Sequence, residues 1–280
     1  MQKSITYIAL LIISCTVFSS CSLFSKRYEK VDKGEYKINA AGKKSFSLNN
    51  VNGKIKVVKG SDSTAIIVKY LKVIYAKKRD LDRTMESEIS MTLDTIGTEV
   101  KIETEFDHTA DQIHFGEYRE NRVDYEIYVP ENIELNIDNT NGTIDVQSIT
   151  NNAKINTING TIKVARLTGK LDLETSNGTI KGTLDSTKGL TASTENGDIN
   201  FTFGPKLRGH VKADVVHGNI KTKNLNFSNL RDSRDKDEFE GYLGGDIEGT
   251  LGNNSDVKIK LETTNGTIKL TGSDSEKLEI

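Results

Sequence analysis

The sequence predicts an all-β protein that folds as a single-chain parallel β-solenoid with coils of about 18–21 residues. The first observation behind this prediction is a phrase that the chain repeats four times with small changes. The copies are L-N-I-D-N-T-N-G-T-I-D-V (135–146), A-K-I-N-T-I-N-G-T-I-K-V (153–164), L-D-L-E-T-S-N-G-T-I-K-G (171–182) and L-T-A-S-T-E-N-G-D-I-N-F (190–201). Their Asn-Gly pairs begin at Asn141, Asn159, Asn177 and Asn196, so the steps are 18, 18 and 19 residues. Self-similarity at such a period indicates a repeat architecture.

The second observation is the alternation of apolar and polar residues within each copy. Leu171, Leu173 and Thr175 share one face, whereas Asp172 and Glu174 lie on the other. A period of two is typical of strands with one buried side. Continued through the corner, the count places the Asn of each Asn-Gly pair on the buried face, where stacked coils form a hydrogen-bonded ladder. The predicted ladder consists of Asn52, Asn141, Asn159, Asn177, Asn196, His217 and Asn265.

An antiparallel hairpin meander or sandwich is the alternative, because Asn-Gly is also the strongest local signal for a type I′ turn. Stacked coils explain better why Asn returns at one position of the repeat. Ordering the 18 residues of one coil costs roughly 27 kcal/mol. Burying Leu171, Leu173, Ile180 and Leu184 returns only about 6–12 kcal/mol. Each coil therefore needs neighbours above and below it.

Residues 1–20 are interpreted as a lipoprotein signal peptide. The apolar run from Ile5 to Phe18 is too short to span a bilayer but suits a signal-peptide core. Ser19-Ser20-Cys21 resembles a lipobox, and Cys21 is the predicted site of lipidation, including palmitate. Phe18 departs from the Leu that this motif prefers, and residues 12–15 fit the local pattern but leave too short an apolar core. An ordinary secretory signal is the alternative.

The rest of the chain is divided by its patterns. Residues 21–34 are predicted to be the lipid anchor and tether, and residues 35–275 the β-solenoid domain. Within that domain, 35–130 is the irregular part and 131–270 carries the regular repeats, with further copies at 52–55, 217–220, 244–247 and 265–268. Residues 77–90 are interpreted as a short helix, and 271–280 as a charged tail that caps the open end.

Composition limits the partners. The only two cysteines, Cys15 and Cys21, lie in the leader segment, so the mature domain has neither a disulfide nor a thiolate metal site. The chain has 38 basic and 40 acidic residues, and removing residues 1–20 takes away Lys3, so the net charge changes from −2 to −3. This charge gives no reason to expect binding to nucleic acid or to anionic membranes, and the lipid anchor is the only predicted membrane contact.

Candidates for chemistry are few. Four residues in 106–121 have a spacing that suits a metal ion: His108, Asp111, His114 and Glu117. Such a stretch is more often a solvated loop, which is the favoured interpretation. Asp172 and Glu174 lie on one face, about 7 Å apart, within the range of hydrolytic carboxylate pairs. Such pairs arise in most alternating strands, so no catalytic residue, metal site or cofactor is predicted. Signatures of nucleophilic hydrolases, phosphate loops and zinc proteases are missing.

The outward positions of the repeats mix acidic and basic residues and include no aromatic side chain, and the chain has no Trp. A sugar-binding groove normally uses aromatic rings as platforms, so this composition argues against carbohydrate binding on the regular faces. Residues 230–240 carry charges of both signs and are predicted to form a loop that projects from one coil. This loop is either simply solvated or a contact for a partner.

Several segments together resemble the DUF4097 family of candidate adhesins, over roughly residues 36–270. They are V-D-Y-E-I-Y-V-P-E-N-I-E-L-N-I (123–137), the N-G-T-I repeats, V-H-G-N-I (216–220) and the closing G-Y-L-G-G-D-I-E-G-T-L-G…V-K-I-K-L-E-T-T-N-G-T-I-K-L (241–270). The resemblance implies a β-solenoid in the bacterial envelope and supplies no catalytic residue.

The resulting hypothesis is a lipid-anchored, non-enzymatic adhesion or interaction module whose partner is an envelope protein or glycan. The alternatives are a polysaccharide-active β-helix enzyme and a scaffold or sensor in envelope-stress signalling. Ser22, which follows the predicted lipid attachment site, is not the Asp that usually retains lipoproteins in the inner membrane. The expected location is therefore the outer membrane or the cell surface.

Overall fold

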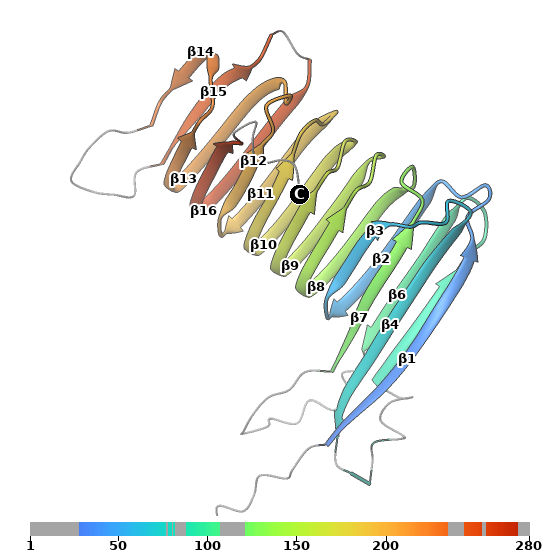
Figure 1. The fold of residues 1–280 in the computed structure, drawn as a ribbon. Helices are drawn as coiled ribbons and strands as arrows, with labels where there is room; N and C mark the ends of the chain where they lie inside the picture. Colours follow the sequence, from blue (N-terminus) through green and yellow to red (C-terminus); the bar gives the residue numbers. More distant parts are fainter. Residues whose placement is uncertain are drawn as a thin grey trace, which may run out of the picture.

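The computed structural model describes residues 28–76, 78–79, 81, 88–106, 121–234, 244–253 and 256–273. The predicted all-β class is confirmed, because these residues form a 16-stranded sheet system. The strands follow one another as an elongated stack (Figure 1). Within the described ranges, no helix has the length and hydropathy that crossing a membrane requires.

The strands are β1 (Tyr28–Asn39), β2 (Ser45–Asn52), β3 (Ile55–Lys59), β4 (Ala65–Ala76), β5 (Ile89–Asp94), β6 (Glu99–Phe106), β7 (Arg122–Val129), β8 (Glu134–Gln147), β9 (Ala153–Ala165), β10 (Lys170–Leu184), β11 (Gly189–Asn196), β12 (Ile199–Phe203), β13 (Gly209–Lys223), β14 (Phe227–Asp232), β15 (Gly245–Leu251) and β16 (Lys258–Gly272).

The repeats form the central part of this system, called here the parallel stack. It consists of β8, β9, β10, the pair β11 and β12, β16 and β13, all parallel to their neighbours. Equivalent residues of the copies stand side by side, so that Leu171 pairs with Ala153 and with Leu190. Equivalent positions of the sequence repeat are therefore paired in the register of the sheet.

The core runs as columns along the stack. One column contains only isoleucine, each at most 5% exposed: Ile55, Ile144, Ile162, Ile180, Ile199, Ile268 and Ile220. Each buried isoleucine contributes about 1.5–3 kcal/mol relative to an exposed one. The predicted buried set of Leu171, Leu173, Ile180 and Leu184 is confirmed, since all four are fully buried.

The copies do not stack in the order of the chain. β16, the last strand, lies between β11 and β12 on one side and β13 on the other. Asn265 consequently pairs with Asn196, and His217 pairs with Asn265. The copy at 244–247 is not part of the parallel stack, because β15 runs antiparallel to β13 and places Gly245 opposite Val215. Its prediction as a further parallel repeat is wrong.

Antiparallel strands extend the stack at its N-terminal end, where the two halves of the first coil separate. In one branch β2 pairs with β6, which pairs with β5; in the other β3 pairs with β7, followed by β4 and β1. The pairs β5–β6, β4–β7 and β1–β4 are antiparallel. The buried Thr104 of β6 and Tyr125 of β7 connect the two branches by a hydrogen bond of 2.6 Å between their hydroxyl groups.

A parallel coil throughout 35–275 is therefore a wrong prediction at both ends, since β13, β15 and β14 are also joined by antiparallel pairs. The predicted tether of 21–34 is wrong from Tyr28 onward, because β1 begins there and pairs with β4 along its whole length. The partner of this polar segment is the apolar run A-I-I-V-K-Y-L-K-V-I-Y-A, which lies more than thirty residues later in the chain.

Several predicted features lie outside the described residues. They are the leader 1–20 with Cys21, the four metal-ligand candidates in 106–121, most of the expected helix 77–90, residues 235–240 of the charged loop, and the tail from 274 to 280.

Candidate functional site

The asparagine of each Asn-Gly pair lies at a corner of the stack and bonds to its counterpart on the next strand. The side-chain amide of Asn159 donates to Asn141 at 3.0 Å, and that of Asn177 donates to Asn159 at 3.0 Å. The same bond joins Asn196 to Asn177 at 3.0 Å, Asn265 to Asn196 at 2.8 Å and Asn141 to Asn52 at 2.6 Å. His217 continues the column beside Asn265.

These asparagines are not buried, which corrects the expected orientation. Asn159, Asn177, Asn196, Asn265 and His217 are exposed, and Asn52 and Asn141 are half-buried. The reason is a shift of one residue at the corner: in β10 the buried side chains have odd numbers up to Thr175 and even numbers from Ile180 onward. The ladder therefore runs along the outside edge.

The corner glycines explain the spacing of the coils. A Cβ atom added to Gly178 would stand 1.7 Å from the carbonyl oxygen of Gly160, and one added to Gly197 would stand 1.7 Å from that of Gly178. Gly142, Gly197 and Gly266 also have φ values of 129°, 154° and 158°. Only glycine permits this close approach of neighbouring backbones.

A second polar column lies inside the corner. It consists of Asn50, Asn139, Thr157, Thr175, Thr194 and Thr263, all buried. The hydroxyl of Thr263 donates to the carbonyl oxygen of Gly197 at 3.0 Å. That of Thr175 has no partner among the described residues. The interior of the corner is thus polar but incompletely satisfied.

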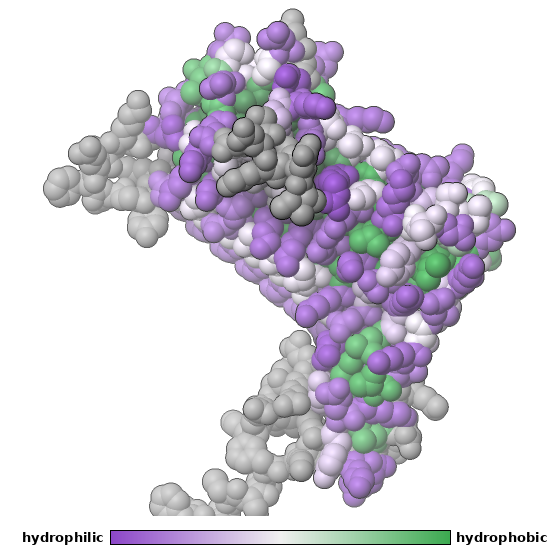
Figure 2. Space-filling view, viewed as in Figure 1, coloured by the Kyte–Doolittle hydropathy of each residue, from purple (hydrophilic) through white to green (hydrophobic). Residues whose placement is uncertain are grey.

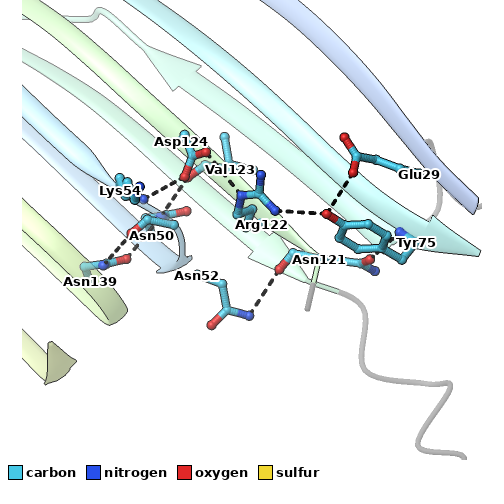
Figure 3. A network of polar contacts seen from close by, with 11 residues as sticks. Glu29, Asn50, Asn52, Lys54, Tyr75, Asn121, Arg122, Val123, Asp124 and Asn139 are labelled. Carbon is cyan, nitrogen blue, oxygen red and sulfur yellow. Dashed lines mark hydrogen bonds and ion pairs between the residues drawn. The ribbon is translucent and has the colours of Figure 1, made fainter. Parts of the chain in front are cut away.

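Both polar columns end at a junction with the N-terminal strands (Figure 3). The amide of Asn50 donates to the carbonyl oxygen of Val123 at 3.3 Å and to Asn139 at 3.0 Å. The amide of Asn52 donates to the carbonyl oxygen of Asn121 at 3.3 Å. These contacts attach β7 to the first coil.

Charged groups extend this junction across β7, β4 and β1 (Figure 3). Asp124 accepts hydrogen bonds from the backbone N–H of Lys54 at 2.8 Å and from Arg122 at 3.2 Å. Arg122 also donates to the hydroxyl of Tyr75 at 3.3 Å, and that hydroxyl donates to Glu29 at 3.0 Å. The hydrogen bond to Tyr75, followed by that to Asp124, raises the pKa of Arg122 despite its partial burial. The network connects β7, β4 and β1 at the junction.

The outer face of the second half of the coils carries a cationic row. Its members lie in one outward column of β9, β10, β12, β16 and β13, in the order Lys163, Lys181, Asn200, Lys269 and Lys221. Adjacent strands are about 4.8 Å apart, so the row is about 19 Å long. Within the described part of the chain, no ion pair joins any of its four lysines to a carboxylate, whereas Lys56, Lys59, Lys101 and Lys260 are paired.

A groove of about 400 Å³ follows this row. Its lining combines Lys163, Lys181, Asn200 and Lys269 with the hydroxyl-bearing Thr183, Thr202 and Thr271 of the next outward column. Asp145 stands opposite Lys163 at the end of the row and accepts a hydrogen bond from Gln147 at 2.9 Å. The column continues beyond it with Lys56 and Glu126. The groove therefore presents unpaired positive charge beside hydroxyl groups.

The outer face of the first half of the coils carries an acidic row: Asp138, Asn156, Glu174, Ser193, Glu262 and Asp214. A groove of about 370 Å³ is lined by Glu174, Glu262 and Asp214 among others. Asp172 is absent from this lining and stands between Lys154 and Thr191 in the next column. The structure does not place Asp172 and Glu174 in a common groove. Within the described ranges, no three His, Cys, Asp or Glu side chains are placed to hold a metal ion.

The charges thus separate by column. On the face of the acidic row, the neighbouring column carries Lys154, Lys260 and Lys212, so the expected mixture of acids and bases is present there, whereas the groove of the cationic row is lined by no carboxylate of the described residues. The separation is not visible along the chain because neighbouring positions of one strand belong to different columns, and because β16 inserts Lys269 and Glu262 between earlier copies. Hydrophilic residues cover most of the stack in the view of Figure 2, with hydrophobic residues in separate patches.

The sequence matches the Toastrack DUF4097 family over residues 116–271, more than half of the chain. The chain belongs to this family. The Toastrack match covers every strand of the parallel stack together with β7, β14 and β15. No curated protein matches the chain.

Solved structures similar to this Toastrack chain include a candidate cell adhesion protein from Clostridium sporogenes. It is 12% identical, with 87% of this chain and 100% of the other covered and a TM-score of 0.48. A candidate adhesin from Bacteroides fragilis is 12% identical, with coverages of 86% and 97% and a TM-score of 0.35. A candidate lipid-binding protein from Parabacteroides distasonis is 11% identical, with coverages of 88% and 97% and a TM-score of 0.34.

Proposed function

We propose that this chain is a lipid-anchored, non-enzymatic interaction module of the bacterial cell envelope, with a role in adhesion. In this proposal the strands form a β-solenoid whose outer faces bind a partner, and Cys21 carries the lipid that holds the protein at the outer membrane or cell surface. The asparagine ladder and the corner glycines maintain the register that the outer faces require.

The observation that carries the proposal is the sorting of outward charges into rows along the stack. Lys163, Lys181, Lys269 and Lys221 repeat at the spacing of the strands and have no carboxylate partner among the described residues. Like charges placed directly opposite each other on neighbouring strands destabilise a sheet. An external partner of opposite charge would relieve this repulsion when bound.

Binding is tested by immobilising the full chain in neutral detergent and passing sonicated envelope fragments over it. The proposal expects retention of fragments that falls as salt is raised, because exposed charge contacts are screened beyond about 10 Å at 0.1 M ionic strength. A protein that retains no fragments at low salt contradicts the interaction role.

Anchoring and the absence of turnover are tested separately. Cells fed a palmitate analogue are expected to label the wild-type protein, and Cys21→Ser is expected to remove the label and release the protein from membranes. Incubation of the full chain with a panel of polysaccharides is expected to generate no new reducing ends and no unsaturated products. Turnover abolished by Asp172→Asn or Glu174→Gln would establish an enzyme instead.

A further inference from the structure

We infer that the groove lined by Lys163, Lys181 and Lys269, together with Lys221 at the next position of the row, is a binding site for a linear acidic polysaccharide that lies across the strands of the parallel stack. This inference rests on the proposed function and names the chemical class of its ligand. The row is straight and one side chain wide, and its lysines form no ion pair within the described residues.

The periodicity of the row suits a polymer with regularly repeated charge. Lys163 and Lys181 lie on adjacent strands, as do Lys269 and Lys221, and Asn200 separates the two pairs. The spacing of about 4.8 Å between strands is comparable to the length that one sugar ring adds to a linear chain. A uronate polymer can therefore place successive carboxylates near successive lysines without bending.

The neighbouring column supplies the second kind of contact that a sugar needs. Thr183, Thr202 and Thr271 border the lysines in the same groove, and all three are half-buried. Their hydroxyl groups can donate and accept hydrogen bonds, and Asn200 adds an amide within the row. Sugar hydroxyl groups beside each carboxylate meet these polar side chains.

An acidic polysaccharide does not require the aromatic rings that the outward faces lack. Neutral sugars depend on such rings as platforms, whereas an acidic polymer is held by ion pairs. The same lack of rings disfavours single-stranded nucleic acid, whose bases stack on aromatic side chains. The acidic row with Glu174, Glu262 and Asp214 lies on the outer face of the other half of the coils and repels the same polymer. The groove of the cationic row, whose described lining contains no carboxylate, is therefore the favoured site.

The test measures binding of polygalacturonate to the immobilised full chain, with its fully methyl-esterified form as the neutral probe. Polygalacturonate is expected to bind at low salt and the ester to fail. The double variant Lys181→Gln/Lys269→Gln is expected to bind the polymer about tenfold more weakly, because two exposed ion pairs are lost. The matched control Lys154→Gln/Lys212→Gln removes the same charge from the other face and is expected to bind like wild type.

Equal losses in the groove variant and the control variant would overturn the inference, because binding would then follow net charge alone. Absence of polygalacturonate binding, or tighter binding of single-stranded DNA of equal charge, would also overturn it. Retention of envelope fragments distinguishes the two levels: fragments held equally by wild type and groove variant contradict the groove but preserve the interaction role. Circular dichroism and thermal unfolding confirm that each variant is folded.

Discussion

Gly178 approaches Gly160 so closely that the carbonyl oxygen of Gly160 occupies the space where a side chain of Gly178 would begin. Replacement by alanine would place Cβ 1.7 Å from that oxygen, which belongs to the backbone of the neighbouring strand β9. We expect Gly178→Ala to lower the free energy of unfolding by about 3–5 kcal/mol. Urea unfolding followed by circular dichroism measures it.

Gly42→Ala is the matched control for this substitution. Gly42, unlike Gly178, has a positive φ of 74°, and nothing lies within 4 Å of the added Cβ. Its expected cost is the left-handed backbone alone, about 1–2 kcal/mol. Equal costs at the two positions would show that the close approach along the stack does not determine the stability of the corner.

The exposed ladder is expected to contribute modestly. Asn177→Ala removes one bond to Asn159 and one from Asn196, whereas Asn265→Ala removes the bond to Asn196. At about 0.5–1.5 kcal/mol per bond, the first change should cost about twice the second. Chemical denaturation of both variants checks the ratio, and a neutral Asn177→Ala would show that water replaces the ladder without loss.

The buried threonine column gives a prediction of opposite signs at equivalent positions. The hydroxyl of Thr175 is buried without a partner among the described residues, so Thr175→Val should raise stability by about 1–2 kcal/mol. Thr263→Val removes a hydrogen bond of 3.0 Å and should lower stability by about 0.5–1.5 kcal/mol. Thermal and urea unfolding of the pair test this, and stabilisation by both changes would contradict it.

Tyr125 predicts the alkaline limb of the stability profile. Burial raises the pKa of Tyr125 above the ordinary value of 10.0, although the hydrogen bond to Thr104 opposes this shift. Since the folded pKa is the higher one, the contribution is fully present below pH 10 and is lost as pH rises toward the folded pKa. Wild type should lose about 1.4 kcal/mol per pH unit above pH 10 from this group. The profile of Tyr125→Phe should lack this component, whereas parallel profiles between pH 9 and 11.5 would exclude it.

Repulsion between the lysines of the cationic row should lower the stability of the folded protein. Lys181 stands opposite Lys163, so Lys181→Gln relieves repulsion between like charges and should slightly raise the melting temperature at low salt. The gain should shrink at 1 M salt, where the Debye length is about 3 Å. A melting temperature that falls, or a change independent of salt, would show that the lysine stabilises the strand by packing.

The local features of this fold could be read from the sequence because each depends on residues near one another. The alternation of Leu171 and Leu173 reveals the buried face, and the period of Asn-Gly reveals the corner. The prediction that Asn177 is buried was wrong because the alternation of buried and exposed residues shifts by one residue at the corner. No pattern of polar and apolar residues in the sequence marks this shift. The antiparallel direction of β15 was missed because the local sequence around Gly245 resembles that of a corner glycine. In the structure Gly245 instead pairs with Val215 in an antiparallel ladder.

The cationic row needed the spatial order of the strands. Lys269 and Asn200 are 69 residues apart in the sequence and directly paired in the sheet. Lys181 shares β10 with the exposed Lys170. Lys269 shares β16 with the exposed Lys258 and Lys260, so nothing along one strand singles out the members of the row. The row is recognised only once the register and the insertion of β16 are known.

The position of β16 also concerns the order in which the chain can acquire its structure. Because β16 separates β12 from β13, the segment 209–223 has, among the described strands, only the antiparallel β15 as a neighbour until residues 258–272 have been synthesised. Assembly of that region must wait for β16, and a product terminated before this strand would leave apolar strand surface without a cover. Such a product would be a substrate for proteases and chaperones, whereas β16 joins the earlier coils to β13 in the folded protein.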